Sequence, residues 1–247
     1  MINYRASIVI SCFSLSLTIA LFCYRNNASQ STFFSSANVE QKIDRELLSK
    51  IEATTVKVIL PSSSGSGLVI EKNNNSYTVV TNRHVANRGD KYQIQTVDND
   101  IYQGRLLTMS SKNDLAILQF TSDRIYPVAA INLKLLKPNE PLFTAGFPFN
   151  SDRLTVTSGK MLLETKKPLK QGYQLGYSNP IEKGMSGGAV FNSLGEVVGI
   201  NGRSANPIIP DYQYQDLTYP SQRLQKQMAQ LSWGIPIAKA IKLNSNY

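Results

Sequence analysis

Short runs of β-branched and aromatic residues follow one another along most of this chain, with almost no helical pattern between them. Turn-forming segments rich in Gly, Ser, Asn and Pro separate the runs, for example 61–67 and 72–76. The runs are TTVKVIL, SGLVIE, SYTVVT, YQIQTV, LAILQF, LFTAGF, RLTVTSGKMLL, GYQLGY, GAVFN and EVVGIN. Because parallel strands need long crossover connections, usually helices, this pattern excludes a parallel α/β sheet. It predicts a pair of antiparallel barrels or a sandwich.

Helical patterns flank these strands. Apolar residues recur at helical spacing from 38 to about 53, and Asn38 with Gln41 predicts a capping pair at the start of this helix. Near the other end, Leu224 and Met228 indicate a second, short helix. The segment WGIPI then predicts a last strand, followed by one or two helical turns at 238–243.

The first 37 residues differ in kind from the rest. Segment 6–23 has no charged side chain and lies between Arg5 and Arg25. Its length falls between the core of a signal peptide and a short membrane span. The polar segment after it ends in Ser-Ser-Ala at 35–37, small residues that suit signal peptidase but lie far from the apolar core. We therefore expect residues 1–37 to be a signal peptide or an N-terminal membrane anchor plus a polar linker, and the protein to be exported.

Composition excludes several classes of function. Both cysteines, Cys12 and Cys23, lie in the first segment, and the chain has one histidine. The remainder therefore cannot form disulfides or a His/Cys metal cluster, and we predict no metal and no cofactor. The formal net charge is +9, but Lys and Arg are scattered without the basic stripe typical of nucleic-acid binding. We expect no nucleic-acid partner; contact of the basic surface with anionic lipids next to an anchor is a further interpretation.

Three residues stand out as candidates for chemistry. His84, in TNRHVA, is the only histidine, and taken alone it is more often a packed structural residue than a base. Asp114, in SKNDLAILQF, directly precedes an apolar run, where an aspartate is usually a turn-former or a surface charge. Ser186, in KGMSGGAV, is surrounded by three glycines that let consecutive N–H groups face one point and leave the hydroxyl exposed. Each signal is weak alone, but their joint occurrence indicates a catalytic set.

The glycine pattern around the serine has a second interpretation. Gly184, Ser186 and Gly188 match the G-x-S-x-G nucleophile elbow of α/β-hydrolases. In that fold the histidine follows the serine, whereas no histidine follows Ser186 in this chain. The order of the residues therefore excludes the elbow.

Serine, histidine and aspartate together can perform acyl transfer. A serine hydroxyl is a poor nucleophile at neutral pH, so a neutral imidazole must take its proton during attack and return it to the leaving group. A buried carboxylate on the other ring nitrogen fixes the tautomer and stabilises the imidazolium. The negative oxygen of the tetrahedral intermediate needs hydrogen-bond donors, and the amides of Gly184 and Ser186 are the candidates for this oxyanion hole.

The blocks TNRHVA, NDLAIL and GMSGGAVFN…GEVVGIN occur in an order that resembles the trypsin-like (chymotrypsin-fold) serine peptidases, and among them the bacterial HtrA/Deg-type branch. The resemblance covers roughly residues 50–243. It implies an all-β fold of two antiparallel six-stranded barrels, with a preceding helix and short C-terminal helices. His84 and Asp114 would come from the first barrel and Ser186 from the second. It also implies polypeptide substrates.

The resemblance also locates a substrate pocket and shows where this chain departs from the family. The pocket residues would be Pro180, Ile181, Ile200, Asn201 and Gly202. Pro180 stands where a trypsin would place an aspartate, so we expect cleavage after small to medium apolar residues. Asp211 or Asp216, in the unusual stretch 203–232, could enter the pocket and reverse this preference. Met185 replaces the usual Asn or Asp, and we expect no PDZ-like domain.

Together these patterns predict a trypsin-like serine protease domain at 38–247. The expected function is an exported serine endopeptidase, periplasmic or extracytoplasmic, with a possible tether through residues 6–23. The alternative is a catalytically silent trypsin-fold scaffold that binds peptides or a partner.

Overall fold

The computed structural model describes residues 43–149 and 151–245 of the chain. The predicted leader, the segment 6–23 and the capping pair at Asn38 and Gln41 lie outside the described residues. In the part of the chain that is described, no helix is both long enough and apolar enough to cross a membrane.

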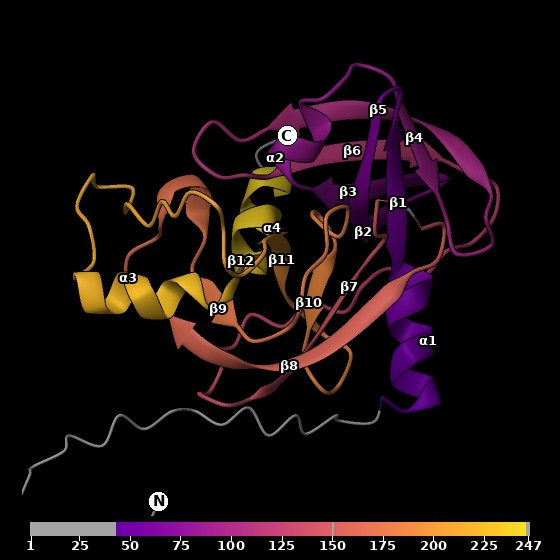
Figure 1. Ribbon diagram of the computed structural model, residues 1–247. Coiled ribbons are helices and arrows are strands. Elements are labelled where there is room, and N and C mark those ends of the chain that lie inside the picture. Colours follow the sequence, from indigo (N-terminus) through magenta and orange to yellow (C-terminus); the bar gives the residue numbers. More distant parts are fainter. Residues whose placement is uncertain (1–42, 150, 246–247) are drawn as a thin grey trace, which may run out of the picture. The chain divides into compact units, whose positions relative to one another are not determined.

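The first six strands form a closed antiparallel barrel (Figure 1). Its strands are β1 (Thr55–Leu60), β2 (Ser63–Asn73), β3 (Ser76–Thr81), β4 (Tyr92–Gln95), β5 (Ile101–Met109) and β6 (Ala116–Thr121). They pair in the order β1-β2-β3-β6-β5-β4, and β1 closes the barrel by pairing with β4. A short helix, α2 (Arg83–Ala86), directly follows β3. Every second residue of β1 and β6 fills the interior, for example Val56 and Val58, because successive side chains of a strand point to opposite faces.

A second closed barrel follows in the chain (Figure 1). Its strands are β7 (Pro141–Gly146), β8 (Thr155–Glu164), β9 (Leu175–Tyr177), β10 (Ala189–Phe191), β11 (Val197–Arg203) and β12 (Ser232–Pro236). The order is β10-β11-β12-β9-β8-β7, with β10 pairing with β7 to close it. The expectation of two six-stranded barrels is confirmed, and the sandwich alternative is wrong because each sheet closes on itself.

Besides α2, one helix precedes the first barrel, and the other helical segments lie within and after the second barrel. They are α1 (Arg45–Thr54), the 3₁₀ turn η1 (Lys170–Gly172), α3 (Gln222–Ala229) and α4 (Ile237–Ser245). The first helix begins at Arg45 and not near 38 as predicted. Asp44 is its N-cap, and the side chain of Asp44 accepts a hydrogen bond from Leu47 N at 2.7 Å. This carboxylate cap satisfies a free N–H of the first turn and so defines the start.

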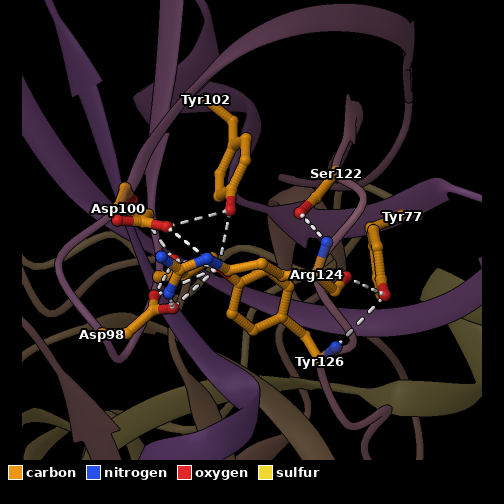
Figure 2. A network of polar contacts seen from close by, with 8 residues as sticks. Tyr77, Asp98, Asp100, Tyr102, Ser122, Arg124 and Tyr126 are labelled. Carbon is orange, nitrogen blue, oxygen red and sulfur yellow. Dashed lines mark hydrogen bonds and ion pairs between the residues drawn. The ribbon is translucent and has the colours of Figure 1, made fainter.

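One strand, β5, was absent from the predicted runs. Its sequence IYQGRLLTM contains polar and exposed positions, and Gly104 is its only fully buried residue. Beyond its N-terminal end a polar network ties the β4–β5 turn to the segment after β6, as Figure 2 shows. Arg124 pairs with Asp98 at 2.8 Å and with Asp100 at 3.0 Å, while Tyr126 Oη donates to Asp98. Pairing with both neighbours, rather than a strong apolar pattern, holds β5 in the sheet.

Candidate active site

His84 and Asp114 meet at one end of the first barrel. His84 lies on α2, just after β3, and Asp114 immediately precedes Leu115 and β6. Because β3 and β6 are antiparallel neighbours, with Thr81 paired to Ala116, the end of one strand and the start of the other lie side by side. The two side chains are therefore brought together by the register of a single strand pair.

The contact between these two residues is double. His84 Nδ1 lies 2.6 Å from Asp114 Oδ2, and the His84 backbone N–H donates to Asp114 Oδ1 at 2.8 Å. Asp114 is 1% exposed, whereas the His84 side chain is 36% exposed. The buried carboxylate thus holds one ring nitrogen, and the rest of the imidazole faces the solvent side, where it can exchange a proton with a substrate.

The electrostatics of Asp114 keep it ionised. Burial alone would raise the pKa of this carboxyl, but hydrogen bonds and the charge of His84, together with a hydrogen bond from Tyr173, leave the pKa below its ordinary value. A charged Asp114 favours the tautomer of His84 that carries its proton on Nδ1. In that tautomer the other ring nitrogen is a proton acceptor.

Ser186 comes from the second barrel, in the loop before β10, and packs against the first. Ser186 O accepts a hydrogen bond from Ser66 N of β2 at 2.8 Å. The Ser186 hydroxyl donates to Gly202 O at 3.4 Å, and among the described residues no hydrogen bond joins it to the His84 ring. Catalytic hydrogen bonds are often long in a ligand-free site and tighten when substrate binds.

The neighbours of Ser186 show how near the histidine segment lies. A Cβ built on Gly65 would be 2.6 Å from Val85 Cγ1 and 3.3 Å from Ser186 O, so Val85 and Ser186 lie against the same point of β2. A Cβ on Gly202 would likewise contact Tyr173 Oη and lie 3.0 Å from Asn82 Oδ1. The structure therefore brings the serine loop against the helix that carries His84.

The loop before Ser186 presents two N–H groups. Lys183 O accepts from Phe149 N at 2.8 Å, and Met185 O accepts from Asn201 Nδ2 at 3.1 Å. A trans peptide points its C=O and N–H in opposite directions. The next N–H groups, those of Gly184 and Ser186, therefore point away from these anchors and have no hydrogen-bond partner in the described part of the chain. Two such donors, with one residue between them, can bind a negative oxygen.

Gly184 needs to be glycine for this geometry. Its φ is +100°, a region that side chains disfavour. A Cβ there would collide with Phe149 N, and would lie 2.6 Å from Phe147 O and 2.8 Å from Pro148 C. These are backbone atoms that cannot move aside as a flexible side chain would.

A cavity of about 480 Å³ adjoins Ser186. Its lining residues are Ile181, Glu182, Lys183, Ser186, Gly202, Arg203, Ser204, Pro207, Ile209, Asp211, Tyr212 and Trp233. Residues of the stretch 203–232 thus supply much of its wall, and Asp211 is among them. Asp216 instead pairs with Lys167 at 2.6 Å.

Two of the five residues predicted for the pocket line this cavity, namely Ile181 and Gly202. Ile200 and Asn201 are fully buried in β11, and Asn201 uses its side chain to bind Met185 O and the Tyr177 hydroxyl. Pro180 is exposed and is not a lining residue. The inward face of β11 supports the serine loop, so only its last residues reach the cavity.

Two polar residues at the site were not singled out from the sequence. Ser66, fully buried in β2, donates from Oγ to Gly184 O at 2.9 Å and accepts from Phe147 N at 2.8 Å. Tyr173, just before β9, donates to Asp114 Oδ2 at 2.5 Å. Ser66 lies between two glycines, a pattern that indicates a close backbone approach within a strand. No comparable signal marks Tyr173.

Comparisons with known proteins agree with this arrangement. Residues 65–200 match the family described as a trypsin-like peptidase domain. A probable periplasmic serine endoprotease, DegP-like, of Marinomonas sp. (strain MWYL1) is 34% identical over 57% of this chain and 29% of its own length. Serine protease HTRA1 of Xenopus laevis is 28% identical over 69% of this chain and 37% of its own. The chain therefore spans well under half the length of these relatives.

A solved structure shares the fold. The serine endoprotease from Yersinia pestis superposes with a TM-score of 0.63 over 81% of this chain and 65% of that one, at 23% identity. One assignment follows from three observations: the two closed barrels, the family match over more than half of the chain, and the similarity to DegP-like and HTRA1 proteins. The chain belongs to the family of trypsin-like peptidase domains and is similar to its HtrA- and Deg-type members.

Proposed function

We propose that this chain is a serine endopeptidase that cleaves polypeptides with His84, Asp114 and Ser186. In the proposed reaction His84, held by Asp114, takes the proton of the Ser186 hydroxyl as that oxygen attacks the peptide carbonyl. His84 then returns the proton to the leaving amine, and water hydrolyses the acyl-enzyme. The domain that carries this activity would extend over 38–247.

The observation that carries the proposal is the pair of N–H groups of Gly184 and Ser186, which have no hydrogen-bond partner among residues 43–149 and 151–245. The N–H groups of Gly184 and Ser186 would bind the oxygen of the tetrahedral intermediate, with Gly184 in the positive-φ conformation that this requires. The 2.6 Å contact between His84 and the buried Asp114 supports the role of His84 as the base. The names of the relatives, which are serine proteases, agree with this reaction.

A fluorophosphonate probe and the Ser186→Ala variant test the proposal together. The probe should label the unsubstituted chain and fail to label Ser186→Ala, and peptide hydrolysis should fall by several orders of magnitude in that variant while the thermal unfolding midpoint stays close to that of the parent. A variant that kept most of its activity would refute the assignment. A chain that folds but is neither labelled nor active would favour a silent peptide-binding scaffold.

We also propose that the protein is exported and acts in a periplasmic or extracytoplasmic compartment. The apolar segment 6–23 and the periplasmic description of the Marinomonas relative support this location. Whether the segment is cleaved or retained as a tether is decided by membrane fractionation followed by N-terminal sequencing. A full-length chain in the cytosolic fraction would contradict export.

A further inference from the structure

Tyr173 joins the second barrel to the carboxylate of the first. It lies in the segment between η1 and β9, is 1% exposed, and its hydroxyl is 2.5 Å from Asp114 Oδ2. The same oxygen lies 2.6 Å from His84 Nδ1, while Asp114 Oδ1 accepts from the His84 backbone N–H. Asp114 therefore has one side-chain partner from each barrel.

The direction of the Tyr173 hydrogen bond follows from the chemistry of the two groups. Burial, followed by the charge of Asp114, raises the pKa of the Tyr173 phenol well above its ordinary value, so the hydroxyl keeps its proton. The Asp114 carboxyl has a lowered pKa and is ionised, and an ionised carboxylate can only accept. Tyr173 is therefore the donor, in a short bond to a charged acceptor, the stronger kind of hydrogen bond.

The backbone around Tyr173 is fixed at several points. Asp114 N donates to Gln171 O at 2.7 Å, and Lys239 Nζ donates to Gly172 O at 3.0 Å. The guanidinium of Arg203 lies 4.4 Å from the centre of the Tyr173 ring. Arg203 therefore contacts the ring of Tyr173 itself, whereas Lys239 contacts the backbone of the residue before it. Because Arg203 also lines the cavity, the wall of the cavity and the support of Asp114 meet at this ring.

We propose that Tyr173 is a positioning residue for Asp114. Its hydroxyl fixes the carboxylate so that Oδ2 faces His84 Nδ1, and it shares the negative charge that would otherwise act on the imidazole alone. This inference rests on the proposed peptidase function for its kinetic consequence, but the link to His84 itself can be measured without any activity.

The first experiment compares Tyr173→Phe with Tyr126→Phe. Both substitutions remove only a hydroxyl group, in each case from a buried tyrosine that donates a hydrogen bond to an aspartate. The aspartate partner of Tyr126 is Asp98. These two residues belong to the network labelled in Figure 2, away from His84, Asp114 and Ser186. Tyr173→Phe should lower kcat for a peptide substrate about tenfold with little change in KM, since a hydrogen bond to a charged group is lost. Tyr126→Phe should leave both constants close to those of the parent.

The second experiment uses the fact that the chain has a single histidine. Its ring signals in an NMR titration of the full chain can come from His84 alone, and the Ser186→Ala background prevents self-cleavage. Loss of the Tyr173 hydroxyl concentrates the charge of Asp114 on the imidazolium and stabilises it. The titration midpoint should therefore lie at higher pH in Tyr173→Phe than in its parent, and stay in place in Tyr126→Phe.

The outcomes separate this inference from the proposed function. An unchanged midpoint in a folded Tyr173→Phe variant would overturn the positioning role even if the enzyme is active. A shifted midpoint, found together with no peptidase activity in the folded chain that keeps Ser186, would support the role and refute the function. If Tyr173→Phe does not fold, the unsubstituted nitrogen-15-labelled chain decides. The ring N–H proton of His84 should give a low-field signal that is split by coupling to nitrogen-15. A second low-field signal without this coupling would come from a hydroxyl proton and would support the Tyr173 hydrogen bond. If only the coupled signal is seen, the hydrogen bond is contradicted.

Discussion

Replacement of Gly184 by alanine should remove activity while leaving the protein folded. At φ +100° the added Cβ meets the backbone of Phe147, Pro148 and Phe149, so the 183–184 peptide must rotate. Rotation breaks the hydrogen bond from Phe149 N to Lys183 O and turns the Gly184 N–H away from the oxyanion position. Loss of one such donor costs about 2.7–4 kcal/mol in the transition state, which corresponds to a fall in kcat of roughly 10²–10³-fold.

Gly195→Ala is the matched control for this variant. Gly195 also has a positive φ, of +77°, but it lies in the turn between β10 and β11. The atoms nearest to an added Cβ there are the side-chain carbons of Leu47, at 3.2 Å, and Lys50, at 3.3 Å, which can yield. We expect this control to lose about 1 kcal/mol of stability from backbone strain and to keep its kcat.

The assay is steady-state hydrolysis of a peptide substrate, with the rate of fluorophosphonate labelling and the thermal unfolding midpoint measured on the same samples. Gly184→Ala should show a low kcat, slow labelling and a cooperative unfolding transition. The reasoning is wrong if Gly184→Ala retains more than a tenth of the parent kcat, or if Gly195→Ala loses as much activity as Gly184→Ala.

Three further predictions follow from the same site. Ser66→Ala should lower kcat about tenfold, because Gly184 O and Phe147 N lose their hydrogen-bond partner, at a cost of about 1–3 kcal/mol. The control Ser63→Ala removes a hydroxyl that has no partner among the described residues, and it should leave kcat unchanged. Activity should rise between about pH 5 and 8, the range in which imidazole side chains ordinarily change charge. Asp114, whose pKa is lowered, stays charged over this range. A flat profile would contradict this prediction. A peptide-library digest should show cuts after small to medium apolar residues, whereas a majority after Lys or Arg would indicate that Asp211, which lines the cavity, pairs with a basic substrate side chain.

Local pattern predicted most of the strands. Runs such as SYTVVT and LAILQF are strongly apolar because β3 and β6 are buried along nearly their whole length. The strand β5 escaped because its residues are mostly exposed or half-buried, so its sequence carries little apolar pattern. The predicted start of α1 is wrong because the spacing of apolar residues does not define where a helix begins. The N-cap at Asp44 defines it.

The pocket was harder to predict because it depends on which face of a strand turns inward. Ile200 and Asn201 were assigned to the pocket on the strength of their position after the serine block. Both are fully buried instead, and half of the residues that line the cavity come from 203–232, a stretch that is unusual for the resembled family. Side chains that follow an irregular loop have no sequence period from which their direction can be read.

The two supporting residues differ in how far the sequence could reveal them. Ser66 lies between Gly65 and Gly67, and glycines inside an otherwise apolar strand indicate that another backbone comes close. Ser186 O is that backbone, and a side chain at 65 would separate it from β2. Tyr173 has no such mark, because its partner Asp114 is 59 positions away in the other barrel. A buried hydroxyl needs a hydrogen-bond acceptor. The sequence, however, does not show whether the acceptor of a tyrosine lies nearby in the chain or in the other barrel. Motifs can therefore point to the residues that we propose bear the chemistry, whereas the residues that hold them in place emerge only once the two barrels are packed together.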